Sequence, residues 1–389
     1  MTASLNPVFA ERPVTIFAVM TALANEHGAI NLGQGFPDED GPKEILEAAA
    51  RAVVSGPNQY APVAGVPALR EAVARANKRF YDLDVDWKTE TLVVSGATEG
   101  LAAAFLAFLK PGDEAILFAP FYDSYAPMVE AAGATVVALG LAPPDWRVSE
   151  VALEGAITPR TRVIAINSPH NPTGHVIGED ELDVIARAAI KHDLLVICDE
   201  VYEHLLFDGR RHLPLMTLAG MRERCIRIGS AGKTFSLTGW RIGYVTGPAA
   251  LVTAVMKAHQ FIAYTSPAHL QSAVAAGLDM GDDYYRAFLA SMEEKRDLMR
   301  EGLLSAGFDV LACEGTYFMT VDIRSVGRAD DMAFCRETTE KAKVAAVPVS
   351  AFYHPSSENA PRHYARFCFC KRREVLEEAS RRLKRYFAA

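Results

Sequence analysis

The sequence has few cysteines and no Cys-x-x-Cys pair. Its six cysteines are scattered along the chain, and the closest two, Cys368 and Cys370, are separated by one residue. A disulfide framework or a structural zinc site needs a denser or more regular spacing, so no metal site is predicted. Scattered cysteines of this kind are typical of a reducing compartment, which favours a cytoplasmic location.

Long hydrophobic runs and blocks of one charge are also missing. The apolar run 101–109 covers nine residues, whereas a helix that spans a bilayer needs about 20. No basic start followed by an apolar stretch marks a secretory signal. Forty Lys and Arg against forty-eight Asp and Glu give a net charge of −8 that is spread along the chain. We therefore expect neither a membrane nor a nucleic-acid partner.

The sequence is instead rich in apolar residues that follow two alternating patterns. Half of the 389 residues are hydrophobic, which is enough for a large core in two or three lobes. Segments with apolar residues at spacings of three and four alternate with short β-branched runs at 92–95, 115–118, 163–166, 194–198 and 225–228. This alternation predicts an α/β fold with a parallel or mostly parallel sheet covered by helices on both faces.

The pattern changes after about residue 280. One long helix is predicted over 284–304, and strand-like pieces near 317–321 and 365–369 precede a terminal helix at 374–386. The turn-rich N-terminal arm is expected to pack on this smaller α+β lobe and to line a cleft. The predicted division is an arm with part of the small lobe at 1–42, a large lobe at 43–282 and a small lobe at 283–389.

Polar residues follow four of the apolar runs. In open α/β sheets ligands bind beyond the carboxyl ends of the strands, so these residues are candidates for a site. The four segments are Ser95-Gly-Ala-Thr-Glu-Gly, Asn167-Ser-Pro-His-Asn-Pro-Thr-Gly, Asp199-Glu-Val-Tyr and Gly229-Ser-Ala-Gly-Lys-Thr.

Lys233 lies among small residues just past the last of these runs. An amine held there can be partly desolvated, which favours the neutral form that attacks carbonyl groups. The alternatives are a solvated surface lysine and the lysine of a P-loop. Position 227 is Arg, where the P-loop pattern needs its first glycine, so the P-loop alternative fails.

Asp199 ends a wholly apolar run, where a carboxylate requires a proton donor or a positive charge as its partner. A protonated pyridine nitrogen would serve, and a helix cap or a buried hydrogen bond is the alternative. Tyr202 and Asn171 are donors that could reach a phenolic oxygen on the same ring. Tyr122 could lie flat on that ring, and core packing explains it equally well.

A phosphate group could bind where a helix begins at Gly96, Ala97 and Thr98, because free backbone amides and the helix dipole favour an anion. Ser230 and Arg241 could add a hydroxyl and a fork of charged donors. A simple helix N-cap is the alternative for the first segment.

Arg366 lies inside an apolar strand of the predicted small lobe. Burying a guanidinium there is costly unless an anion meets it. That anion could be the α-carboxylate of a substrate, bound by two parallel hydrogen bonds, or the partner in a structural salt bridge.

Taken in order, these motifs resemble those of fold-type I pyridoxal-phosphate enzymes, specifically class I aminotransferases. The resemblance covers nearly the whole chain and rests on Asn171-Pro-Thr-Gly, Asp199-Glu-Val-Tyr, Ser230-Ala-Gly-Lys-Thr-Phe-Ser-Leu-Thr-Gly-Trp-Arg-Ile-Gly and Arg366. Asn31-Leu-Gly-Gln-Gly-Phe-Pro-Asp, Asn58-Gln-Tyr-Ala-Pro and Cys313-Glu-Gly-Thr-Tyr-Phe are similar to the branch with kynurenine aminotransferase, glutamine transaminase K and bacterial methionine aminotransferases. The implied fold has a large, mostly parallel seven-stranded sheet domain between helices and a smaller α+β domain.

The resemblance also implies a role for each matching residue. Lys233 would hold the cofactor, pyridoxal 5'-phosphate, as an imine and then move the proton between the substrate α-carbon and the cofactor. Asp199 would hold the ring nitrogen, Asn171 and Tyr202 the phenolic oxygen, and Tyr122 would stack on the ring. The phosphate would be bound by Gly96, Ala97, Thr98, Ser230 and Arg241, and the substrate carboxylate by Arg366 and Gly35.

The implied active unit is a homodimer, because Tyr60 would reach the phosphate of the neighbouring subunit. Relatives that prefer dicarboxylates add a second arginine, and the stretch 259–267 has none. With Phe17, Tyr60 and Tyr122 nearby, the expected amino donor is methionine, glutamine or an aromatic amino acid, and the acceptor is a 2-oxo acid. A carbon–sulfur β-lyase on the same fold is the alternative that these motifs do not separate.

Overall fold

A seven-stranded sheet is the largest element of the computed structural model, which describes residues 5–56, 58–357 and 359–387. In order across the sheet, the strands are β2 (Thr91–Val94), β8 (Gly243–Thr246), β7 (Cys225–Ser230), β6 (Leu195–Asp199), β5 (Thr161–Asn167), β3 (Glu114–Ala119) and β4 (Thr135–Gly140). Strand β8 is antiparallel to both neighbours, and the other neighbouring pairs are parallel. The predicted mostly parallel sheet is therefore confirmed.

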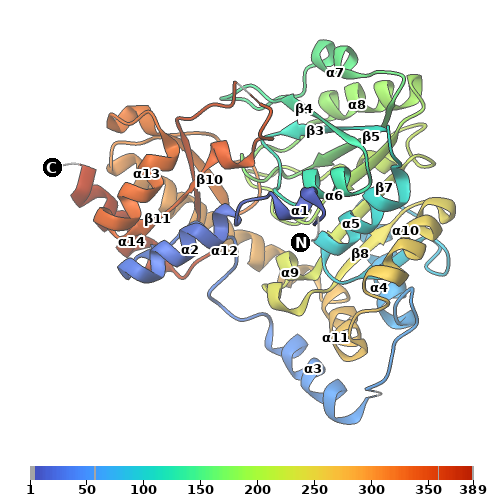
Figure 1. The fold of residues 1–389 in the computed structure, drawn as a ribbon. Helices are drawn as coiled ribbons and strands as arrows, with labels where there is room; N and C mark the ends of the chain where they lie inside the picture. Colours follow the sequence, from blue (N-terminus) through green and yellow to red (C-terminus); the bar gives the residue numbers. More distant parts are fainter. Residues whose placement is uncertain (1–4, 57, 358, 388–389) are drawn as a thin grey trace.

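Helices cover both faces of this sheet (Figure 1). One face packs on α5 (Ala97–Phe108), α6 (Tyr125–Ala131) and α10 (Ala249–Ile262), and the other on α7 (Glu150–Ala156) and α8 (Glu179–Lys191). Within β3, Ala115 and Leu117 belong to the first core while Ile116 and Phe118 belong to the second. Because successive side chains point to opposite faces, a strand covered on both sides reads as one apolar run.

A third core lies beside β2 and β8. There α3 (Lys43–Ser55), α4 (Pro67–Tyr81) and α11 (Ala268–Leu278) pack on Val93 and Tyr244. The one-turn helix α9 (Ala231–Thr234) follows β7 directly. Its position carries the side chain of Lys233 to the carboxyl edge of the sheet.

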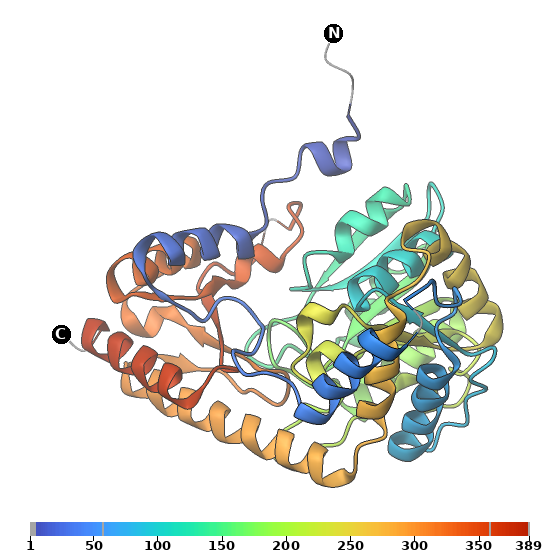
Figure 2. The ribbon, with the colours of Figure 1, turned by 90° about the horizontal axis from the view of Figure 1, so that it is seen from below.

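A smaller four-stranded sheet, in the order β12–β13–β10–β9, carries the other lobe, on the left in Figure 1. Its strands are β12 (Val347–Pro348), β13 (Tyr364–Cys368), β10 (Phe318–Asp322) and β9 (Asp309–Val310). The long α12 (Asp282–Ser305), α13 (Asp331–Glu337) and α14 (Arg373–Phe387) pack against it, and α12 runs along one side of the molecule in Figure 2.

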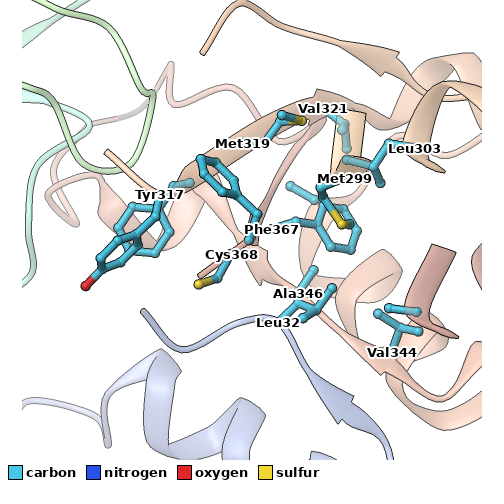
Figure 3. Packing of buried hydrophobic residues seen from close by; sticks show 14 of the residues in the cluster. Leu32, Met299, Leu303, Tyr317, Met319, Val321, Val344, Ala346, Phe367 and Cys368 are labelled. Carbon is cyan, nitrogen blue, oxygen red and sulfur yellow. The ribbon is translucent and has the colours of Figure 1, made fainter. Parts of the chain in front are cut away.

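The N-terminal segment joins this smaller lobe. Helix α2 (Ile16–His27) packs there, and β1 (Ile30–Asn31) pairs in parallel with β11 (Val344–Ala345). Figure 3 shows Leu32 lying next to Ala346, in the same core as Phe367 and Cys368. The boundaries predicted at residues 42 and 282 stay a prediction.

The remaining short elements are α1 (Pro7–Ala10), four 3-10 segments at Leu215–Thr217, Thr238–Trp240, Ile323–Val326 and Val349–Phe352, and a π-helical segment at Thr338–Ala342. In the described part of the chain, every helix is too short or too polar to cross a bilayer.

Candidate active site

A cavity of about 270 Å³ lies where the carboxyl ends of β5, β6 and β7 meet the N-terminal segment and β13. Most of the residues singled out in the sequence line it. These are Phe17, Gly35, Ala97, Thr98, Tyr122, Asn171, Asp199, Tyr202, Ser230, Lys233, Arg241 and Arg366. Gly96 lies directly beside the cavity and contacts Arg241, whereas Tyr60 lines a different hollow.

Lys233 reaches into this cavity from α9. Its Nζ donates to the backbone oxygen of Gly35 over 3.5 Å and lies 5.7 and 5.5 Å from the ring centres of Tyr202 and Tyr317. Burial lowers the pKa of this amine, because an ammonium group loses hydration there. The lysine is therefore suited to form a covalent bond with an aldehyde, and the alternative of a solvated surface lysine is excluded.

Asp199 is the last residue of β6 and is buried. Its Oδ2 accepts a hydrogen bond from the Tyr125 hydroxyl, and its Oδ1 accepts one from the backbone N–H of Val201 at 3.4 Å. Burial raises the pKa of this carboxyl to about 6. Among the described residues no arginine or lysine forms an ion pair with it, so a charged hydrogen-bond donor from a ligand would find a free partner here.

Arg366 is fully buried on β13, and its guanidinium carbon lies 3.7 Å from the ring centre of Phe318. Its Nη1 donates to Asn171 Oδ1 at 2.6 Å and its Nη2 to the backbone oxygen of Gly33 at 2.7 Å. The Nε has no acceptor, and no described carboxylate pairs with the group. Burial lowers the pKa of Arg366 to about 10. The salt-bridge alternative is therefore absent from the described residues, and a ligand carboxylate would relieve the desolvation cost.

Two asparagines hold the loop that follows β5 next to Asp199. Asn167 Nδ2 donates to the backbone oxygen of Asp199 at 2.9 Å, and Asn167 Oδ1 accepts from the backbone N–H of Asn171 at 2.8 Å. Because Asn171 Oδ1 is occupied by Arg366, its amide nitrogen is the group left for a ligand. Tyr202, whose ring meets that of Tyr317 edge-on at 5.2 Å, is a second donor on the same side.

Donors for an anion gather where α5 begins. Gly96 has φ 78°, and a Cβ at this position would lie 2.7 Å from Arg241 Nη2, so only glycine lets the guanidinium approach. The first backbone amides of a helix have no partner within the helix and favour negative charge. Ser230 Oγ accepts from Gly232 N at 3.2 Å, which leaves its hydrogen for another acceptor. Together these groups match a phosphate.

Tyr60 lies apart from these residues. Its side chain is 84% exposed, and its ring meets that of Tyr264 edge-on at 5.3 Å. It lines a hollow with Ser266, whose Oγ is 3.0 Å from Ser95 Oγ, so the hollow adjoins the start of α5. Tyr60 is therefore not among the described residues that line the cavity.

Several residues of the site were missed in the sequence. Tyr125 is hydrogen-bonded to Asp199, and Phe318 covers the guanidinium of Arg366. Gln34, Phe36 and Leu101, which were given no role, also line the cavity, as do Asn167 and Val201 from the candidate segments. The spacing of Tyr122 and Tyr125 by three is a weak helical signal, whereas the pairing of β10 with β13 that brings Phe318 to Arg366 leaves no local signal.

The groups around the cavity fit pyridoxal 5'-phosphate. A partly buried amine is present for the aldehyde, a buried carboxylate without a cation for the ring nitrogen, and donors at the start of α5 for the phosphate. The buried Arg366 Nε without an acceptor adds a place for a second anion, such as an amino acid carboxylate.

Comparisons with known proteins agree with this geometry. The family model described as aminotransferase class I and II matches residues 27–383. A probable N-succinyldiaminopimelate aminotransferase of Mycobacterium tuberculosis is 48% identical over 377 residues, 95% of each chain. The methionine aminotransferase of Escherichia coli is 40% identical over 370 residues, again 95% of each.

Solved structures show the same likeness. The structure of N-succinyldiaminopimelate aminotransferase from Mycobacterium tuberculosis has a TM-score of 0.95 and 47% identity, and the match covers 98% of this chain and 99% of that one. A Thermus thermophilus aspartate aminotransferase with maleate has a TM-score of 0.90 at 32% identity, covering 99% and 100% of the two chains. The chain therefore belongs to the aminotransferase class I and II family, and it is a pyridoxal-phosphate-dependent enzyme with the fold-type I architecture.

Proposed function

We propose that this aminotransferase takes its amino group from L-amino acids with neutral, mainly apolar side chains and passes it to a 2-oxo acid in two half-reactions. Methionine, glutamine and the aromatic amino acids are the expected donors. The observation that carries this proposal is the charge of the cavity wall. Among the described lining residues, the cationic side chains are Lys233, Arg241 and Arg366. In our assignment Lys233 bonds to the aldehyde, Arg241 binds the phosphate and Arg366 binds the α-carboxylate. No cation then remains for a second substrate carboxylate.

Apolar side chains make up most of the rest of the substrate end of the cavity. Phe17 and Phe36 come from the N-terminal segment, and Phe318 comes from β10. These rings favour an apolar or aromatic side chain, because its transfer from water is favourable by about 25 cal/mol per Å². Gln34 can hydrogen-bond a neutral amide such as that of glutamine.

The cofactor, when bound, supplies an electron sink for the electron pair of the broken α-carbon–hydrogen bond. In this proposal Asp199 holds the proton on the cofactor's ring nitrogen, and Asn171 and Tyr202 donate to the phenolic oxygen. Tyr122, which lines the cavity, would cover one face of the ring and keep water away from it. Arg366 and the backbone of Gly35 fix the substrate carboxylate, which orients the α-hydrogen toward Lys233.

Lys233 then acts as the general base and acid. When the cofactor is bound, the Lys233 amine would take the proton from the substrate α-carbon, and the ammonium group so formed would give that proton to the cofactor; the second half-reaction would reverse this path. The lowered pKa of Lys233 supports this role, because a base must be unprotonated near neutral pH.

A second candidate substrate comes from the relatives. The Mycobacterium tuberculosis protein with 48% identity is named a probable N-succinyldiaminopimelate aminotransferase. That substrate carries carboxylates beyond the reacting amino acid, and the described cavity offers them no unassigned cation. Turnover of it would therefore need a cation supplied by a second subunit.

We also propose a homodimer in the cytoplasm, with domain boundaries near residues 42 and 282. Support for the dimer is the exposed Tyr60 in a hollow next to the start of α5, close to where we place the phosphate. A tyrosine from a second subunit seated there would add a hydroxyl to the donors at the start of α5.

The test is a panel of amino acids mixed with the holoenzyme in single half-reactions, read as loss of the cofactor absorbance. Methionine, phenylalanine and glutamine should react faster than aspartate and faster than N-succinyldiaminopimelate. Faster reaction of either multi-carboxylate substrate would overturn the proposed substrate class. Release of pyruvate from cysteine conjugates without any oxo-acid would instead support the β-lyase alternative.

A further inference from the structure

Tyr125 is the closest side-chain partner of Asp199, and no other described side chain donates a hydrogen bond to that carboxylate. It begins α6 and is 2% exposed, so water does not compete for the hydroxyl. Its ring is held on several sides, stacked on Phe121 at 6.4 Å and meeting Tyr122 edge-on at 5.9 Å. A tyrosine locked in this way points its hydroxyl at one carboxylate oxygen and at nothing else.

We infer that Tyr125 is a positioning residue that keeps the Asp199 carboxylate ionised and in one orientation, so that the shared proton stays on the ring nitrogen of the cofactor. The inference rests on the proposed role of Asp199. Tyr125 itself touches neither the cofactor nor the substrate in this assignment, because it is absent from the cavity lining. It would act through Asp199 alone.

The physical reason is the competition of two bases for one proton. A buried carboxylate is a stronger base than an exposed one, since burial penalises its charged form. A hydroxyl that donates to the carboxylate stabilises the anion and lowers its basicity. Without Tyr125 the proton would shift from the ring nitrogen toward Asp199, and the ring would lose the positive charge that makes it an electron sink.

Other charged and titratable groups face the same carboxylate and must be common to all variants compared. They are Lys233 on α9, Glu200 and Tyr202 on the turn after β6, and Tyr122 before α6. Because Tyr125→Phe leaves each of them in place, differences between this variant and the wild type report on the one hydroxyl.

The matched control is Tyr353→Phe. The Tyr353 hydroxyl is also buried but has no hydrogen-bond partner among the described residues, and it lies outside the cavity lining. Its removal therefore reports the general effect of deleting a buried tyrosine hydroxyl.

The first measurement uses the protein freed of cofactor. The pKa of Asp199 is raised by burial to about 6 in the folded state, above its ordinary value of 3.8. A raised carboxyl pKa means that folding is favoured at low pH and that this contribution is lost as pH rises from 3.8 through 6. Removing the Tyr125 hydroxyl should raise the pKa of Asp199 further, so in Tyr125→Phe the loss of stability should continue to higher pH. The denaturation midpoint of this variant should therefore fall relative to that of the wild type between pH 6 and 8. The Tyr353→Phe difference should stay constant with pH.

The second measurement is cofactor binding in a double-mutant cycle with Asp199→Asn. We expect Tyr125→Phe to raise the dissociation constant of pyridoxal 5'-phosphate about tenfold, as for loss of a hydrogen bond to a charged group. In the Asp199→Asn background the same change should have almost no effect, because the carboxylate is gone. Equal effects in both backgrounds, or a flat pH difference in the first measurement, would overturn the inference.

The two assignments can fail separately. If Asp199→Asn alone leaves cofactor affinity and absorbance unchanged, the role proposed for Asp199 is wrong. If Asp199→Asn weakens binding while Tyr125→Phe matches Tyr353→Phe, only the inference about Tyr125 is wrong.

Discussion

The cavity has two unlike walls. The wall formed by the strand ends of the large sheet is polar, buried and tied together, with Asn167 bonded to both Asp199 and Asn171. The wall formed by the N-terminal segment carries two phenylalanines and one polar side chain, Gln34, and it is more open, since Phe36 is 44% exposed. Rigid strand ends suit the groups that hold a cofactor, because chemistry depends on fixed geometry, whereas a surface segment can vary and select the substrate side chain.

The largest effect is expected from Lys233→Ala in the rigid wall. Loss of the amine removes both the covalent attachment and the general base, so kcat should fall by about a thousandfold or more. Borohydride followed by mass spectrometry should find no cofactor bound covalently. Lys257→Ala, at an exposed lysine of α10, is the control and should behave as the wild type.

The next largest effect is expected at Arg366, which joins the two walls by its bonds to Asn171 and Gly33. In Arg366→Lys a point charge replaces a planar fork, so KM for methionine should rise about a hundredfold while the cofactor absorbance stays normal. Steady-state kinetics with several amino acids measures this. An unchanged KM would remove Arg366 from the substrate site.

A smaller effect, on stability, is expected where the loop carrying Asn171 is anchored. His175 lies 3.0 Å from Glu181 and 3.1 Å from Glu314. Burial lowers its pKa, but the hydrogen bonds and charges of these two carboxylates together outweigh burial and raise the pKa of His175 to about 9, above its ordinary 6.5. A raised histidine pKa stabilises the fold below pH 6.5, and this contribution is lost as pH rises through 9. Because one pKa unit corresponds to about 1.4 kcal/mol, we expect the unfolding free energy to fall by about 3 kcal/mol over this window.

Glu314→Gln should flatten that pH dependence, which urea denaturation at pH 6.5, 8 and 9.5 would measure. The matched change Glu26→Gln removes an exposed carboxylate with no described ion-pair partner and should leave the curve parallel to that of the wild type. Parallel curves for both variants would contradict the assignment.

The smallest effect is expected on the open wall. In Phe36→Ala, kcat/KM for phenylalanine and methionine should fall about fivefold, because the lost ring no longer covers the substrate side chain, while that for alanine should hardly change. The backbone oxygen of Phe36 stays bound to Lys371 at 2.7 Å, so the segment keeps its place. Phe9→Ala, on α1, is the control. An equal loss of kcat/KM for all amino acids would mean that the N-terminal wall does not select the substrate side chain.

Much of the fold could be predicted because buried parallel strands have continuous apolar sequences. Five strands of the large sheet coincide with the runs recognised in the sequence, as do α12 and α14. Strand β8, Gly243–Thr246, begins with glycine and is only four residues long, so it gave no clear run. Strand β4 does contain an apolar run at 136–139, which was not recognised as a strand in the sequence.

The candidate site could be predicted where function leaves a local motif. Lys233 and Asp199 stand at the ends of apolar strands, and the structure places both in the cavity. Gln34 and Phe318 belong to the quoted motifs but were given no role, because only tertiary contacts bring them to the cavity. Tyr125 was missed because it reaches Asp199 from behind the cavity lining. The phosphate role of Tyr60 stays a prediction, since it concerns a second subunit.

The hydrogen bond from Arg366 to Gly33 joins residues 333 positions apart. During synthesis the N-terminal segment leaves the ribosome long before β13 is made. The wall formed by the N-terminal segment therefore cannot contact Arg366 until nearly all of the chain has been translated. A nascent polypeptide that already contains Lys233 still lacks the arginine that closes the pocket. Cofactor capture is therefore expected to be a late event, after translation of β13, and chains truncated before it should fail to retain vitamin B6.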